Sequence, residues 1–316
     1  MTHSDRILPG VALMIAFCVI APLIDVASKL AAQQVPVGVV TLGRYVVQAG
    51  LMLPIVLVMG LSLGMTRQAF WLTVLRAAVS ILSTYTFVAA LKVMPVADAL
   101  AIAFVEPFII LLIGALWLKE QVGPRRLAAA AVGFLGALFV IQPSFLVFGA
   151  VALFPLGTAV CFALYMLVTR ELSRHMHPVT MQFHTALVAI VLCLPMLAVG
   201  DRLGEPSLTL VWPAGLDLLW VFCVGLAGTV SHMAMTYALK FAPSSTLAPL
   251  HYLEIVTATL FGYLVFGDFP NALTWVGIAI IVASGLYVIH RERMVARRDR
   301  HRPGPAAAGP GGAGML

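Results

Sequence analysis

Residues 98–118 read DALAIAFVEPFIILLIGALWL, an apolar stretch long enough to cross a bilayer. A carboxylate, Glu106, lies at its middle and is followed at once by Pro107. A charged side chain at the bilayer centre costs at least about 2.5–3.5 kcal/mol, so a glutamate there is a candidate functional residue. Pro107 removes a hydrogen bond from the helix, which frees the carbonyl near Ala103 and makes the proline a candidate hinge.

The composition of the chain indicates an integral membrane protein. Of its 316 residues, 61% are hydrophobic and 10% are charged, whereas soluble domains are roughly 45–50% apolar and about 25% charged. The four cysteines lie singly in apolar stretches, so neither a disulfide framework nor a zinc site is indicated. The sequence contains no Walker A loop, dinucleotide-binding glycine motif or hydrolase motif. No cofactor or metal is therefore expected, and transport would be driven by gradients.

Loop signals such as QQVP, KVMP and KEQVGPRR divide the chain into candidate transmembrane helices. The expected fold class is all-α, with ten crossings. The predicted spans are 8–32, 37–60, 69–92, 95–118, 124–142, 146–170, 177–200, 216–240, 243–266 and 270–290.

Basic residues are distributed unequally between the two sides that these spans define. If the N-terminus is inside, the outer loops hold only Lys92 and Arg202, and all other loop and tail arginines and lysines are inside. The positive-inside rule then predicts that both termini are cytoplasmic in a cell inner membrane. This distribution explains the net charge of +6, so nucleic acid is not an expected partner. Residues 291–316 begin basic, continue as Ala, Gly and Pro, and are expected to form a disordered cytoplasmic tail.

The chain is also similar to itself. ALKVMPVADALAIAFVEP from residue 90 aligns without a gap with ALKFAPSSTLAPLHYLEI from residue 238, an offset of 148. Lys92 matches Lys240, and Glu106 matches Glu254. Each half holds five predicted spans, so the second half enters from the opposite face, as in many secondary transporters. We therefore predict two inverted five-helix repeats, residues 1–145 and 146–290.

The closing segments of the two halves carry a family resemblance. They read ADALAIAFVEPFIILLIGALWLKEQVGPRRLAAAAVGFLGALFVIQP from residue 97 and GDFPNALTWVGIAIIVASGLYVIHRER from residue 267. Both resemble EamA-type permeases of the drug/metabolite transporter superfamily. The resemblance implies a ten-helix carrier whose first, third, fourth, sixth, eighth and ninth spans line a central cavity. It also implies transport of amino acids, vitamins, nucleotide-like metabolites or drugs, without indicating which.

Two glutamates are the central candidates for the transport site. Glu106 and Glu254 fall near the midpoints of the fourth and ninth spans, at the depth where secondary transporters bind cargo. His251 precedes Glu254 by three residues and should share its helix face. Three roles are open to these groups: they carry coupling protons, they bind a cationic or amino group of the cargo, or they form hydrogen bonds that only fix helix packing.

A second group of charges is predicted nearer the outer side. Asp25 and Lys29 are four residues apart on the first span, and Arg44 and Asp98 should lie at similar depth. These four form either an ion network that gates the outer mouth or a static lock between helices, and Lys29 has the further option of snorkelling to the interface.

Other polar side chains of the spans are candidates for the cavity wall. Arg76 on the third span either snorkels to the cytoplasm or binds an anionic cargo group. Self-alignment pairs Thr84 of the third span with His232 of the eighth. Packing within the bundle is the alternative role for each hydroxyl or ring. The remaining candidates are Ser80, Ser83 and Tyr85 on the third span and Tyr165 on the sixth.

The sequence favours a secondary transporter that works by alternating access. Its partners would be a small organic molecule and the lipid bilayer, and it would act as a monomer or homodimer. The first hypothesis is export of an amino-acid-like metabolite, possibly coupled to protons. The second is uptake of a vitamin or nucleoside-like compound such as riboflavin or S-adenosylmethionine. An intramembrane enzyme and a non-transporting sensor are remote alternatives, and no enzymatic activity is expected.

Overall fold

A computed structural model of the chain describes residues 7–106, 109–110, 113, 123–140, 148–267, 272, 275–277, 279–280, 282–284, 286–287, 290 and 294. These residues form helices joined by short loops, and no strand occurs among them. The first half contains α1 (Ile7–Ala31), α2 (Val37–Val58), α3 (Arg67–Leu91), α4 (Val96–Ala103) and α6 (Pro124–Val140). The second contains η2 (Gly149–Ala152), α8 (Leu153–Leu172), α9 (Pro178–Arg202), α10 (Leu216–Phe241), α11 (Ser244–Leu247), η3 (Ala248–Leu253) and α12 (Glu254–Phe266).

The chain is a multi-pass membrane protein by the length and hydropathy of its helices. Within the described part, seven segments are long and apolar enough to span a bilayer. They are Ile7–Ala31, Val37–Val58, Arg67–Leu91, Gly149–Leu172, Pro178–Arg202, Leu216–Phe241 and Ser244–Phe266. Each begins and ends within a few residues of a predicted span. Helix α6 covers most of the predicted span 124–142, whereas the span predicted at 270–290 lies largely outside the described residues.

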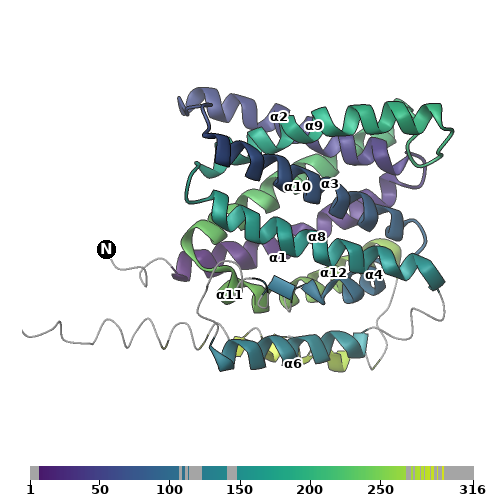
Figure 1. The fold of residues 1–316 in the computed structure, drawn as a ribbon. Coiled ribbons are helices and arrows are strands. Elements are labelled where there is room, and N and C mark those ends of the chain that lie inside the picture. Colours follow the sequence, from purple (N-terminus) through teal and green to yellow (C-terminus); the bar gives the residue numbers. More distant parts are fainter. Residues whose placement is uncertain are drawn as a thin grey trace, which may run out of the picture.

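The long helices lie side by side in a bundle (Figure 1). Helix α1 packs along α10, α2 along α9, and α3 along α8. Small residues permit the closest approaches, since a Cβ atom added to Gly225 of α10 would collide with Val47 of α2. Gly133 of α6 makes the same kind of contact with Tyr252 of η3. The expectation that Gly225 and Gly133 allow helices to approach closely is confirmed.

Two membrane segments are interrupted at positions related by the offset of 148. Helix α4 ends at Ala103, two residues in a turn follow, and Glu106 is again helical. The segment from Ser244 to Phe266 begins as α11, passes through six residues of 3₁₀-helix, and becomes α-helical at Glu254. Pro249 lacks an N–H group, which explains why the α-helical hydrogen bonds fail there. Each glutamate therefore stands directly after a break in its helix. Pro107, the predicted hinge, lies outside the described residues.

Candidate transport pocket

A pocket of about 710 Å³, counted to where it opens outward, lies between the two halves of the chain. Its wall is built by α1, α3, α4, α8, α10 and α12, which are the spans that the family resemblance implies, with one further side chain from α2. The residues used below are Phe17, Asp25, Ser28, Arg44, Ser83, Thr84, Phe87, Phe104, Glu106, Thr158, Phe162, His232 and Glu254.

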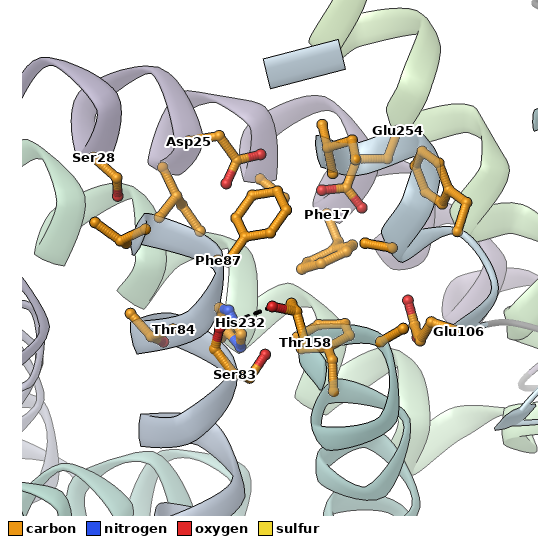
Figure 2. A pocket seen from close by; sticks show the side chains of 18 of the residues that line it. Phe17, Asp25, Ser28, Ser83, Thr84, Phe87, Glu106, Thr158, His232 and Glu254 are labelled. Atoms are coloured by element: carbon orange, nitrogen blue, oxygen red, sulfur yellow. Dashed lines mark hydrogen bonds between the residues drawn. The ribbon is translucent and has the colours of Figure 1, made fainter. Parts of the chain in front are cut away.

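The pocket combines aromatic rings with both kinds of charge. Phe17, Phe87, Phe104 and Phe162 supply the rings, and serine and threonine hydroxyls lie between them. Asp25 and Glu254 reach in from one side, facing Ser83, Thr84 and His232 on the other (Figure 2). Such a wall, mostly apolar with a few placed polar groups, is typical of a small-molecule site.

Glu106 forms a buried pair with His251. Its Oε2 lies 3.1 Å from His251 Nδ1, and the two residues are 5% and 0% exposed. The His251 ring stacks on Phe17, with 5.1 Å between ring centres, so it lies behind the pocket wall rather than in it. Glu106 Oε1 and His251 Nε2 have no hydrogen-bond partner in the described structure. The pair thus has one shared hydrogen bond and one unused polar atom on each residue.

Glu254 and Asp25 present their carboxylates to the pocket more openly. Glu254 makes no side-chain hydrogen bond to the residues that the structure describes, and neither does Asp25, whose Oδ2 is buried without a partner. Together with Glu106, they bring three carboxylates from α1, α4 and α12 into one pocket. The structure therefore places the two sequence-related glutamates in one site, and it adds Asp25, which we had expected in an outer network.

Arg44 connects the two halves of the chain. Its Nη1 donates to Thr84 Oγ1 at 2.5 Å, and its Nη2 donates to His232 Nε2 at 2.7 Å. Thr84 and His232 are the pair that self-alignment predicts. A Cβ atom on Gly228 of α10 would lie 3.1 Å from Arg44 Nε, so the absence of a side chain there leaves room for the guanidinium.

The four predicted outer charges do not surround one mouth. Arg44 bonds to Thr84 and His232, and no ion pair within the described part of the chain joins it to Asp25. Lys29 instead donates to the Met94 carbonyl at 3.2 Å, and its Nζ lies 4.8 Å from the Phe266 ring centre. Asp98 is half-buried in the first turn of α4.

Arg76 is buried at the centre of a network of neutral side chains. It is 0% exposed, so the predicted snorkelling to the cytoplasm is wrong. Its Nε donates to Thr169 Oγ1 at 2.7 Å and its Nη2 to Tyr165 Oη at 2.6 Å. Tyr165 also lies 3.1 Å from His232 Nδ1, so it connects Arg76 to the pocket without lining it.

Tyr85 is not part of the pocket wall, contrary to its candidacy. Its hydroxyl lies 2.6 Å from Ser207 Oγ in the loop between α9 and α10. Sequence reasoning also missed the four phenylalanines of the pocket. The chain contains 17 phenylalanines, and nothing in a uniformly apolar helix separates one that faces a cavity from one that faces lipid.

Comparison with known proteins gives the chain a family. The EamA-like transporter family matches residues 8–142 and again 149–289. A riboflavin transporter of Vibrio cholerae is 28% identical over 84% of this chain and 87% of its own length. A riboflavin transporter of Rhizobium johnstonii is 30% identical over 73% and 72%. An S-adenosylmethionine uptake transporter of Rickettsia felis is 24% identical over 87% and 90%.

A solved crystal structure shares the fold. Its chain is 22% identical, superposes with a TM-score of 0.70, and is covered over 98% of its length by 91% of this chain. The matched segments extend over nearly all of the two halves in which the pocket is built. The chain belongs to the EamA-like transporter family.

Proposed function

We propose that the protein takes up a planar heteroaromatic metabolite of the riboflavin or nucleoside-like class through an inner membrane. The observation that carries this proposal is the pocket, in which four phenylalanine rings surround carboxylates, hydroxyls and Arg44. Flat rings stack favourably on aromatic side chains. The carboxylates and the guanidinium match the hydrogen-bond donors and acceptors at the edge of such a ring system.

Uptake of this class is better supported than export of an amino-acid-like compound. The similar proteins named above are riboflavin transporters and an S-adenosylmethionine uptake transporter. Riboflavin and S-adenosylmethionine both contain a fused heteroaromatic ring, which an aromatic pocket accommodates. An amino acid offers little surface to four phenylalanines.

The transport cycle in this proposal is alternating access between two inverted five-helix repeats, with ten crossings and both termini cytoplasmic. The matched residues at the offset of 148 support it, as do the paired helix breaks before Glu106 and Glu254. Broken helices at the midplane are a recurring feature of secondary transporters, because backbone groups released there can face the cavity.

We assign the coupling of transport to the carboxylates of the pocket. Glu106 and His251 share a hydrogen bond, and Glu254 faces the pocket without one in the described structure. A proton that enters with the cargo would bind at these groups. Replacing both glutamates by glutamine keeps their size and removes the titratable group.

The test uses purified protein in liposomes loaded at a fixed internal pH. Wild-type protein should accumulate radiolabelled riboflavin faster when the outside is acidified. The Glu106→Gln, Glu254→Gln double variant should lose this pH dependence. Glu171→Gln is the matched control, because Glu171 pairs with Arg174 away from the pocket, 3.1 Å apart. Unchanged flux of the double variant at every pH would remove both glutamates from the mechanism. Accumulation of S-adenosylmethionine or of an amino acid in place of riboflavin would reassign the cargo.

A further inference from the structure

Arg76 holds four helices together on one side of the pocket. From α3 it donates to Thr169 and Tyr165 of α8 and to Thr185 and Gln182 of α9. Gln182 in turn donates to Thr236 of α10 at 3.2 Å, and the Arg76 guanidinium lies 4.4 Å from the centre of the Tyr165 ring. Each of these side chains is at most 2% exposed. We call Arg76, Tyr165, Thr169, Gln182, Thr185 and Thr236 the Arg76 seal.

The Arg76 seal and the pocket occupy different levels of the bundle. On α3, Arg76 precedes the pocket residue Ser83 by about two turns. On α8, which runs antiparallel, the order is reversed, with the pocket residue Thr158 near the start and Thr169 near the end. The seal therefore lies between the pocket and the end of the bundle that carries loops 59–66 and 173–177. We call this the sealed end.

A chain of hydrogen bonds connects the pocket to the seal. Arginine donates hydrogen bonds and accepts none. His232 Nε2 must therefore accept from Arg44, which leaves the hydrogen on Nδ1 to be donated to Tyr165. The Tyr165 oxygen accepts from His232 and from Arg76. His232 is thus neutral in one tautomer, and the position of Arg44 in the pocket is tied through two residues to the position of Arg76 in the seal.

We propose that Arg44 senses the cargo and that His232 and Tyr165 are positioning residues, which transmit its movement to the Arg76 seal. An acceptor atom of the cargo competes with His232 for Arg44 Nη2. When Arg44 turns toward the cargo, His232 loses its acceptor role and Tyr165 loses its fixed donor. The Arg76 seal loosens, and the pocket gains access to the sealed end. The proposal rests on the proposed transport function but does not depend on which metabolite is carried.

The test measures access to the pocket from each side of the membrane. A Ser83→Cys substitution places a thiol in the pocket wall, and its labelling by a membrane-impermeant maleimide is followed in spheroplasts and in inverted membrane vesicles, above the background of the native cysteines. In the parent protein the thiol should be labelled from one side only. Tyr165→Phe removes the hydroxyl that receives both bonds. It should raise labelling from the other side roughly tenfold or more, the factor expected for one charge-assisted hydrogen bond.

Two further variants separate this proposal from a general loss of packing. Tyr45→Phe also removes a buried tyrosine hydroxyl, which bonds to Ser80 at 2.8 Å outside the seal, and it should leave labelling from the sealed end unchanged. Arg44→Lys retains the charge but cannot bond to Thr84 and His232 at once, so it should loosen the seal as Tyr165→Phe does. Each variant must show the parent's elution profile by size exclusion.

The outcomes decide the proposal independently of the cargo. Equal labelling from the sealed end in Tyr165→Phe and Tyr45→Phe would overturn the Arg76 seal. Loosening by Tyr165→Phe but not by Arg44→Lys would overturn the link to the pocket. Absence of riboflavin uptake by every protein, with the labelling pattern as expected, would instead reject riboflavin as the cargo and leave the seal supported.

Discussion

Gly228 illustrates at the scale of one residue how a missing side chain positions a charge. We predict that Gly228→Ala shifts the Arg44 guanidinium, because the new Cβ would lie 3.1 Å from Nε. The bond from Arg44 to His232 should weaken, and the KM for riboflavin uptake should rise several-fold. Gly50→Ala on α2 is the control, since nothing lies within 4 Å of its Cβ position. An equal KM in both variants would show that Gly228 does not position Arg44.

A second prediction concerns Arg76. Arg76→Lys keeps the charge, but a single ammonium group cannot reach Thr169, Thr185 and Tyr165 together, so buried acceptors lose their donors. Each unsatisfied group costs about 1–3 kcal/mol, which should lower the thermal unfolding midpoint in detergent. Arg67→Lys, at the exposed start of α3, should leave the midpoint unchanged. A midpoint equal to that of the parent protein would mean that lysine satisfies the same acceptors.

The sequence predicted some of this site and missed the rest for a physical reason. Buried acids and the self-alignment were sufficient to identify Glu106, Glu254 and the Thr84–His232 pair. The partner shared by Thr84 and His232 is Arg44, which was expected beside Asp25 instead. That bond depends on α2 packing closely against α10, and no local pattern encodes which helices meet.

The 3₁₀ stretch η3 is the element whose geometry matters most for the pocket. A 3₁₀-helix turns about 120° and rises about 2.0 Å per residue, against about 100° and 1.5 Å for an α-helix. Over the six residues of Ala248–Leu253, the difference rotates Glu254 by about 120° and moves it by about 3 Å relative to a continuous α-helix. The break therefore aims the carboxylate.

We predict that Pro249→Ala restores the α-helical hydrogen bond that proline prevents. Glu254 should then rotate away from the pocket, and uptake should fall by at least tenfold while the yield of folded protein stays the same. Circular dichroism and flux in liposomes measure the two effects. Pro54→Ala, in the interior of α2, is the control for removal of a proline from a helix. Full activity of Pro249→Ala would show that Glu254 is aimed by its packing rather than by η3.

Helix boundaries were predictable at this scale, whereas the second break was not. Pro107 led us to expect an interruption near Ala103, and α4 does end there. Pro249 gave the same signal in the second half, but the stretch around it reads as one apolar span. Because a proline within a membrane helix is often tolerated by small local adjustments, its presence does not distinguish a kink from six residues of 3₁₀-helix.

The inverted repeat is a property of the whole molecule, and it can be tested directly. Lys92 and Lys240 are aligned at the offset of 148, and both are exposed. If the halves insert in opposite directions, Lys92→Cys should be labelled only from the periplasmic side and Lys240→Cys only from the cytoplasmic side. Impermeant maleimide applied to spheroplasts and to inverted vesicles measures both. Labelling of the two positions from the same side would rule out inversion.

The hydrogen-bond chain through Tyr165 has a consequence for energy conservation. A proton moves along a wire only if every member can accept on one side and donate on the other. Arg44 and Arg76 close this chain with groups that never accept, and their bonds point inward from both ends. The wire is therefore broken at both terminals. A proton held at Glu106 or Glu254 has no route along this chain to the sealed end, so the link that moves the seal does not itself dissipate the gradient.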